Sequence, residues 1–251
     1  MDRASSLPQA ILIDPQRPQP YRLRLARYAI VAQDISDWAG AAVREGRQLA
    51  VLDVGCGWGA LLRHLEITRH FADMTVAATD LTDIRGYKKE LYREFFLADL
   101  TGGYSEIASD GYDVVVCEQV LEHLAALDTA LATLARLVRP GGRLVIGVPI
   151  FFPPLHLVRK YLVPPLARIL RHPATASHQQ AFSLYSFRRL LRRVPGLAVE
   201  QARGFRIISG GLLRPLEYFR WWWRLNRRLG ELMPALCIEA QFVLRKSAIP
   251  S

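Results

Sequence analysis

The sequence is poor in the residues that would build a metal centre or a disulfide framework. Its 251 residues include three cysteines, Cys56, Cys117 and Cys237, which lie far apart and match no metal-ligand spacing. We expect each to be a small buried thiol, and we expect no metal site. The first 20 residues lack the apolar stretch of a signal peptide. This predicts a cytoplasmic protein with an irregular, proline-rich lead-in.

The chain also lacks an uninterrupted apolar run that could span a membrane. Its most apolar segment is 150–173, and proline and basic residues interrupt it, namely Pro153, Pro154, Arg159, Lys160, Pro164, Pro165 and Arg168. Proline ends or kinks a helix, so each piece is too short to cross a bilayer. We expect two short amphipathic helices hinged at Pro164.

Acidic residues are scarce in one part of the chain. Residues 1–150 hold 16 Lys and Arg against 19 Asp and Glu, a net charge of −3, whereas residues 151–251 hold 17 against 4, a net charge of +13. This asymmetry predicts an acidic partner, such as an anionic membrane, a nucleic acid or a phosphorylated substrate. A solvated basic surface is the alternative.

A glycine-rich loop follows a predicted buried strand. The segment 51–62 reads VLDVGCGWGALL, so Asp53 ends an apolar run and three glycines follow at alternate positions. Glycine lets the backbone turn sharply and approach a ligand, and the next helix points its N-terminal amides at the loop. The loop therefore predicts a nucleotide-type cofactor site. A dinucleotide dehydrogenase is the competing interpretation, but its loop reads GxGxxG, whereas this one reads GxGxG after an acid.

Two further predicted strands end near acidic residues. The run 74–80 (MTVAATD) ends in Asp80, where a carboxylate can accept both hydroxyls of an adenosine ribose. The run 94–100 (EFFLADL) contains Asp99, which is placed to bond an adenine amino group. These acids support the prediction of an adenosine site.

Two later segments, 112–124 (YDVVVCEQVLEHL) and 137–149 (LVRPGGRLVIGVP), complete an ordered set of motifs. Over 49–149 this set resembles the class I S-adenosylmethionine-dependent methyltransferases, in particular their small-molecule, type 11-like branch. The resemblance implies an enzyme with S-adenosylmethionine as its cofactor. It assigns the methionine end to Asp53, Gly55, Gly57 and Gly59, the ribose to Asp80, the adenine to Asp99 and Leu100, and the surroundings of the sulfonium to Glu118 and Gln119. Cys56 and Leu81 complete the predicted cofactor-binding set.

The predicted fold is α/β, a Rossmann-like, doubly wound, seven-stranded sheet that is mostly parallel with an antiparallel last strand. We divide the chain into a lead-in with a cap helix over 1–48, a cofactor-binding core over 49–149 and a substrate-side part over 150–251. In the last part we expect a helix at 184–194, a strand at 197–202 and the last strand at 236–244. That strand alternates and is expected at the edge of the sheet, with Ile238, Ala240, Phe242 and Leu244 on one face and Glu239 and Gln241 on the other.

Two basic insertions, 150–182 and 204–234, are longer than connections need and are expected at the ligand-binding edge. The second contains LEYFRWWWRLNRRLG, which predicts an amphipathic helix. Its expected faces carry Arg220, Arg224, Arg227 and Arg228 on one side and Tyr218, Trp221, Trp222, Leu225 and Leu229 on the other. Arginine with tryptophan favours a membrane-interface anchor. RNA binding, packing under the sheet and a dimer face are alternatives. RNA is less favoured because the core lacks the motifs of nucleic-acid methyltransferases and the first insertion is mostly aliphatic.

The resemblance extends in part to quinone-biosynthesis O-methyltransferases, which are similar in having an apolar insertion followed by a histidine and a phenylalanine. The counterparts here are 150–171, His178 and Phe182. We expect O-methylation of an amphipathic or lipid-like small molecule at the inner membrane surface, with His178 or His123 as the catalytic base. The alternatives are a soluble-metabolite methyltransferase, an RNA methyltransferase and a non-catalytic cofactor-binding subunit.

Overall fold

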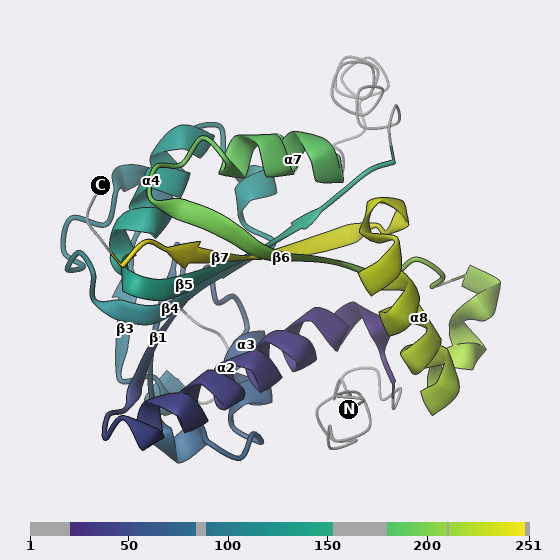
Figure 1. Ribbon diagram of the computed structural model, residues 1–251, viewed down its shortest axis with the longest axis horizontal. Helices are drawn as coiled ribbons and strands as arrows, with labels where there is room; N and C mark the ends of the chain where they lie inside the picture. Colours follow the sequence, from purple (N-terminus) through teal and green to yellow (C-terminus); the bar gives the residue numbers. More distant parts are fainter. Residues whose placement is uncertain (1–20, 84–88, 153–179, 210, 249–251) are drawn as a thin grey trace.

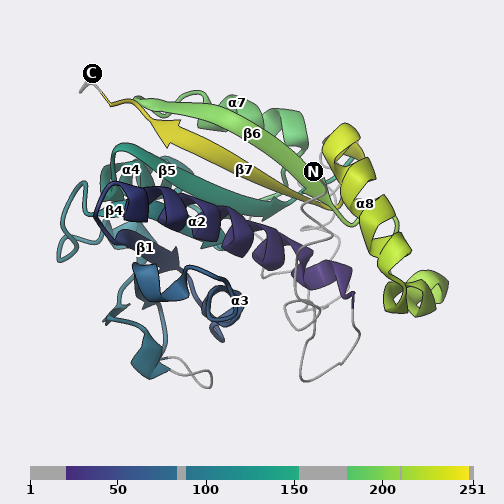
Figure 2. The same ribbon diagram turned by 60° about the horizontal axis from the view of Figure 1, so that its bottom comes forward.

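The computed structural model describes residues 21–83, 89–152, 180–209 and 211–248. Within these residues the chain forms a seven-stranded sheet with helices on both faces (Figures 1 and 2). The sequence predictions for 153–179, including the hinge at Pro164 and the position of His178, lie outside the described residues. Among the helices that the structure describes, none is both long enough and apolar enough to cross a membrane.

The strand order is β3-β2-β1-β4-β5-β7-β6, and the first five strands are parallel. The strands are β1 Leu49–Val54, β2 Met74–Asp80, β3 Glu94–Leu97, β4 Tyr112–Glu118, β5 Val138–Pro149, β6 Leu197–Phe205 and β7 Glu239–Lys246. The strand order reverses direction at β1 and β4, which is where ligands bind in open α/β sheets.

The last strand does not lie at the edge of the sheet, as we had expected. β7 pairs antiparallel with both β5 and β6, so β6 is the edge strand. The reason is visible in its burial, because Phe242 on one face and Gln241 on the other are both inaccessible to solvent. A strand covered on both faces fits inside a sheet. The alternation of its side chains was predicted correctly, but both of its faces are internal.

The helices are α2 Ala26–Arg44, α3 Ala60–Leu65, α4 Leu127–Leu137, α7 Leu184–Leu191 and α8 Arg220–Leu232. The short 3-10 helices are η2 Leu23–Leu25, η3 Phe71–Asp73, η4 Lys89–Leu91, η5 Leu100–Gly102, η6 Leu121–His123, η8 Gly211–Tyr218 and η9 Pro234–Leu236. Helices α2 and α3 cover one face of the sheet, and α4 and α7 cover the other (Figures 1 and 2).

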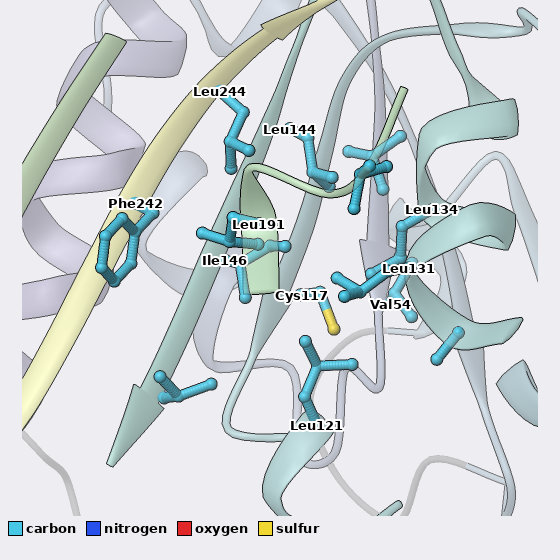
Figure 3. Close-up of a cluster of buried hydrophobic side chains, with 14 of the residues drawn as sticks. Val54, Cys117, Leu121, Leu131, Leu134, Leu144, Ile146, Leu191, Phe242 and Leu244 are labelled. Carbon is cyan, nitrogen blue, oxygen red and sulfur yellow. The ribbon is translucent and has the colours of Figure 1, made fainter. Parts of the chain in front are cut away.

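The hydrophobic core is divided by the sheet into two layers. In the layer beneath α4 and α7, Leu131 and Leu134 pack towards side chains of the sheet such as Cys117 and Ile146 (Figure 3). The opposite layer joins α2 and α3 to the other face of the same strands. Burial of both faces explains why the parallel strands appear in the sequence as continuous apolar runs. All three cysteines are buried free thiols, as predicted.

Helix α8 lies at one end of the molecule, beside the start of α2 (Figures 1 and 2). Its inner face buries Trp222 and Trp223 in a third apolar cluster with Phe205 and Ile30. The predicted division of this helix into faces was therefore wrong, because Trp222 is buried whereas Trp221 remains 53% exposed. A helical repeat shows which residues share a face but not which face packs inward.

Candidate cofactor site

The glycine loop turns out of β1 as the sequence predicts. Gly55 and Gly59 have φ values of 68° and 77°, which side chains disfavour. A Cβ atom at Gly55 would also overlap the Cγ2 atom of Val120. The amides of Gly55 and Cys56 both donate to the carbonyl of Thr79, at 2.8 and 3.1 Å. The loop is thereby tied to the end of β2.

Asp80 ends β2 and faces this loop. Its Oδ2 atom accepts a hydrogen bond from the Gly57 amide at 2.8 Å, and Oδ1 accepts one from the Thr82 amide at 3.2 Å. The Thr82 hydroxyl also donates to Oδ1, at 3.4 Å. A carboxylate has about four acceptor positions, so these three bonds still leave capacity for a ligand hydroxyl. Asp80 can therefore hold the loop and a ribose together.

Asp99 lies two residues beyond the end of β3 and caps η5. Its Oδ1 atom accepts hydrogen bonds from the Thr101 amide at 2.8 Å and the Thr101 hydroxyl at 2.7 Å. Because this 3-10 turn begins at Leu100, β3 ends at Leu97 and is shorter than the predicted strand 94–100. The turn holds the backbone at Asp99 and Leu100 against the site.

A cavity of about 280 Å³ lies at the carboxyl ends of these strands. Its walls include seven of the predicted site residues, Gly55, Asp80, Leu81, Asp99, Leu100, Gln119 and His123. They also include four residues that the sequence did not indicate, Ala98, Tyr104, Val120 and Leu124. The remaining predicted positions, Asp53, Cys56, Gly57, Gly59 and Glu118, adjoin these residues in the chain but do not line the cavity.

Tyr104 lines the cavity, although no motif in the sequence indicated it as a site residue. It is buried, has a positive φ of 49°, and its hydroxyl lies 2.9 Å from the Thr79 hydroxyl. Burial raises the pKa of Tyr104, so it stays protonated. This hydrogen bond joins the cavity wall to the end of β2.

Gln119 connects β4 to η6 and has a side-chain donor that no described residue accepts. Its φ is 59°, and its amide donates to the Gly147 carbonyl at 2.9 Å. Its side-chain Nε2 is buried and has no hydrogen-bond partner among the described residues. An unsatisfied buried donor costs about 1–3 kcal/mol. A ligand acceptor in the cavity would remove that cost. The Gln119 donor, together with the Asp80 and Asp99 acceptors, suits an adenosine cofactor.

Glu118 lies at the end of β4, in a buried polar network. Its Oε2 atom is 3.2 Å from Arg27 Nε, and Gln241 donates a hydrogen bond to Oε1. Arg27 is on α2 and also reaches Glu239, with 3.0 Å between its NH1 and Oε2 of the glutamate. Burial raises the pKa of Glu118 to about 7. The network fixes α2 over the ligand-binding edge.

Glu122 and Asp53 are two further buried acids. Glu122 is 1% exposed and its Oε2 has no hydrogen-bond partner among the described residues, while Asp53 is 3% exposed and accepts from the Tyr92 hydroxyl at 3.4 Å. Burial, together with repulsion from Glu118, raises the pKa of each carboxyl to about 7. The described residues therefore hold an acidic region near the cavity, of which the sequence predicted Asp53 and Glu118 as site residues but not Glu122.

His123, one of the two predicted bases, lies in the cavity wall and is exposed to solvent. Its Nε2 atom is 3.9 Å from Glu122 Oε1. After β4 the chain forms the single 3-10 turn η6, which ends where the backbone becomes extended at Leu124. His123 thus stands at the mouth of the cavity, near a buried carboxylate.

Residues 14–202 match the family described as methyltransferase domain. Among curated proteins, the ubiquinone biosynthesis O-methyltransferase of Mesorhizobium japonicum is 31% identical over 131 residues, 51% of each chain. That of Alkalilimnicola ehrlichii is 33% identical over 111 residues, 41% of this chain and 42% of the relative. The chain therefore spans about half the length of these relatives.

Solved structures share the fold at low identity. The 1,6-didemethyltoxoflavin-N1-methyltransferase of Burkholderia thailandensis, solved with S-adenosylhomocysteine, has a TM-score of 0.52 at 17% identity, covering 86% of this chain and 78% of that one. A SAM-dependent methyltransferase from Archaeoglobus fulgidus has a TM-score of 0.50 at 14% identity, covering 86% and 94%. The chain belongs to the methyltransferase domain family and shares the fold of these S-adenosylmethionine-dependent methyltransferases.

Proposed function

We propose that this enzyme methylates a hydroxyl group of an amphipathic, lipid-like small molecule at the surface of an anionic membrane. The observation that carries the membrane part of the proposal is the outer surface of η8 and α8. The hydroxyl acceptor is supported by the similarity to O-methyltransferases of ubiquinone biosynthesis, at 31–33% identity over about half of the chain.

The surface in question, which we term the basic-aromatic face, joins exposed apolar and basic side chains. It consists of Leu212, Arg214, Tyr218, Phe219, Arg220, Trp221, Arg224, Leu225 and Arg228. Leu212 is 98% exposed and Trp221 is 53% exposed. Apolar side chains of this size favour the headgroup boundary, and each nearby arginine adds about 1 kcal/mol on an anionic surface. The cationic charge argues for a phospholipid surface over an uncharged partner.

The basic-aromatic face and the cavity belong to the same edge of the sheet. Residues 206–238 leave β6 and return to β7 at the edge where the parallel strands end. Strand β5 ends at Pro149, at the same edge of the sheet. The first insertion, 150–182, follows it there, and its first and last residues, Ile150 and Phe182, form a bridge. A substrate embedded in a membrane at the basic-aromatic face would thus approach the side of the sheet that holds the cofactor cavity.

For the cofactor we propose the roles that the family resemblance implies. Asp53 and the loop of Gly55, Gly57 and Gly59, with Cys56, would hold the methionine end. The adenosine would be held by Asp80 and Leu81 at the ribose and by Asp99 and Leu100 at the adenine, with Glu118 and Gln119 beside the sulfonium. S-adenosylmethionine supplies an activated methyl group, so the protein mainly has to orient the acceptor and exclude water.

We propose His123 as the residue that removes the acceptor's proton, because it stands in the cavity wall and is open to solvent. His178 is the second candidate, and it lies outside the described residues. General-base catalysis typically contributes about 10²–10⁴ in rate. A His123→Gln variant should lose turnover on a phenolic acceptor while its S-adenosylmethionine affinity stays within twofold. Full activity of the His123→Gln variant from pH 6 to 9 would contradict a role of His123 as the general base.

The substrate class is tested with tritiated S-adenosylmethionine and two acceptors, a catechol that carries a prenyl chain in phosphatidylglycerol vesicles and the same catechol without the chain. We expect label in the prenylated catechol. Equal turnover of the chainless catechol would favour a soluble-metabolite enzyme. Label only in structured RNA would favour an RNA methyltransferase. Cofactor binding without transfer to any acceptor would favour a non-catalytic subunit.

Membrane binding is tested by flotation with phosphatidylglycerol vesicles. We expect a Trp221→Ser, Leu225→Ser variant to lose most of its binding, because it removes apolar contacts without changing the charge. Tyr185→Ser is the matched control, since Tyr185 is an exposed aromatic residue of α7, on the other layer. Binding that is equal in all three proteins would contradict the membrane role of the basic-aromatic face.

A further inference from the structure

The interior beside the cofactor cavity holds an unusual number of acidic side chains. Asp53 at the end of β1, Glu118 at the end of β4, Glu122 in η6 and Glu239 at the start of β7 are each 5% exposed or less. Glu118 directly precedes the wall residue Gln119, and Glu122 directly precedes the wall residue His123. None of the four acids lines the cavity itself, but Glu118 and Glu122 each adjoin a wall residue, and Arg27 of α2 reaches both Glu118 and Glu239.

Buried arginines compensate only part of this charge. Arg27 contacts both Glu118 and Glu239, and Arg206 NH1 contacts Glu239 Oε1 at 2.9 Å. A third arginine, Arg203, is paired 2.7 Å from Asp34. Among the described residues, no arginine or lysine forms an ion pair with Asp53 or Glu122. At neutral pH and above, the region carries more buried negative than positive charge.

Several buried polar atoms in this region lack a hydrogen-bond partner within the described residues. They include Oε2 of Glu122, which can accept, and Nε2 of Gln119 and Nε of Arg206, which can donate. A buried carboxylate without a partner is costly, and the cost falls when a cation is placed nearby. The geometry therefore indicates a ligand with a positive charge at the end of the cavity near these acids.

We propose that Glu122, supported by Glu118, makes this site selective for the positively charged cofactor, so that S-adenosylmethionine binds more tightly than its neutral product S-adenosylhomocysteine. The inference rests on the proposed placement of the methionine end beside the glycine loop. Transfer moves the methyl carbon from sulfur to the acceptor oxygen, and the electron pair of the broken bond stays on sulfur. The hydroxyl proton leaves through the base to water. The bound cofactor thus loses one positive charge and with it the attraction of the buried acids.

The selectivity depends on pH because the acids must be ionised. The charged or titratable groups that act on Glu122 are Glu118 on β4, Arg27 on α2, Glu239 on β7 and His123 in η6. Asp53 on β1 and Tyr28 on α2 interact with Glu118, and Arg206 after β6 pairs with Glu239. The arginines stay charged at every pH considered. Since burial raises the pKa values of Asp53, Glu118 and Glu122 to about 7, the acids lose their charge below that pH. The preference for the cation should therefore be strong at pH 8 and weak at pH 6.

The experiment is calorimetry of the full chain with S-adenosylmethionine, S-adenosylhomocysteine and sinefungin, which carries an ammonium group in place of the sulfonium. At pH 8 we expect S-adenosylmethionine and sinefungin to bind at least about tenfold more tightly than S-adenosylhomocysteine, since an ion pair of low exposure is worth at least this factor. The ratio of the affinity for S-adenosylmethionine to that for S-adenosylhomocysteine should fall about tenfold in Glu122→Gln at pH 8, and in the wild type at pH 6. Glu106→Gln, which neutralises an exposed acid, should keep the wild-type ratio.

Glu122→Asp keeps the charge and should keep most of the ratio, so it replaces the glutamine variant if that variant does not fold. A ratio that is unchanged in Glu122→Gln at pH 8, or that is equal at pH 6 and 8 in the wild type, would overturn the proposal. Loss of methyl transfer to the prenylated catechol would instead contradict the proposed substrate. The two failures are distinguishable because the affinity ratio is measured without an acceptor.

Discussion

Asp80→Ala is the substitution that tests the cofactor site most directly. It removes the acceptor of the 2.8 Å hydrogen bond from the Gly57 amide and of the 3.2 Å bond from the Thr82 amide. It also removes the carboxylate that we propose for the ribose hydroxyls. Because one side chain serves both the loop and the ligand, the variant should bind the cofactor weakly even though its core is unchanged.

The magnitude follows from the bonds that are lost. A hydrogen bond to a charged group contributes about 1.5–3 kcal/mol, and bonding to the ribose replaces bonding to water. We expect a net loss of about 1.5–3 kcal/mol in binding free energy, or roughly 10- to 150-fold in Kd. Asp80→Asn keeps one carbonyl oxygen for the Gly57 amide and should show a smaller loss. Calorimetry with S-adenosylhomocysteine measures all three proteins.

The matched control is Asp83→Ala, which removes an exposed acid three residues later that pairs with Lys89. Its Kd should stay within twofold of the wild type. A Kd of Asp80→Ala within the same twofold would refute the assignment of the ribose to Asp80. A large loss of thermal stability in Asp80→Ala without ligand would show instead that the carboxylate mainly holds the loop.

Three further predictions concern the fold around the site. Arg27→Met should lower the free energy of unfolding in urea by about 3–5 kcal/mol, because it leaves buried carboxylates without their partner, whereas Arg44→Met at the exposed end of α2 should change it by less than about 0.5 kcal/mol. Gly55→Ala should abolish cofactor binding measured by calorimetry, and adding Val120→Ala should restore part of it, since the overlap with Val120 is then relieved while the strained φ remains. Glu122→Gln should be more stable than the wild type in urea at pH 8 by up to about 3 kcal/mol and should lose this advantage at pH 5. The sign follows because the raised pKa makes the native state bind more protons than the unfolded state between about 4.5 and 7, so wild-type stability falls as pH rises through this window.

One strand of the parallel core, β2, could be predicted to the residue, whereas β3 ends three residues before the end of the predicted strand 94–100. β2 was expected at 74–80 and is found there, because a strand buried on both faces must be apolar throughout. The later strands were harder. β6 continues to Phe205, three residues beyond the prediction, through Arg203 and Gly204. A buried arginine does not look like part of a strand unless its partner, Asp34 on α2, is known.

The same reason explains which part of the site the sequence revealed. The loop and the acids at strand ends follow local patterns, so their meeting at one edge could be predicted from topology. The buried network joins Arg27, Glu118, Arg206 and Glu239, which are distant in sequence and have no common spacing. Only tertiary structure brings such charges together, and hydrophobic periodicity carries no information about them.

The structure also changes the meaning of the C-terminal charge. Part of the net +13 of residues 151–251 lies inside the protein, because the Arg203 side chain is 3% exposed and is paired with Asp34. Arg227, which we had placed on the basic side of its helix, is 12% exposed and contacts Glu231. The arginines of the C-terminal part therefore fall into a buried group and an exposed group with different roles. The inner ones pair with carboxylates of the protein, Arg203 with Asp34 and Arg206 with Glu239, while outward residues such as Arg220 and Arg224 give the basic-aromatic face its charge. Because salt screens exposed charges far more than buried ones, high ionic strength should weaken membrane binding while leaving the buried ion pairs, and the proposed cofactor selectivity of the buried Glu122, largely intact.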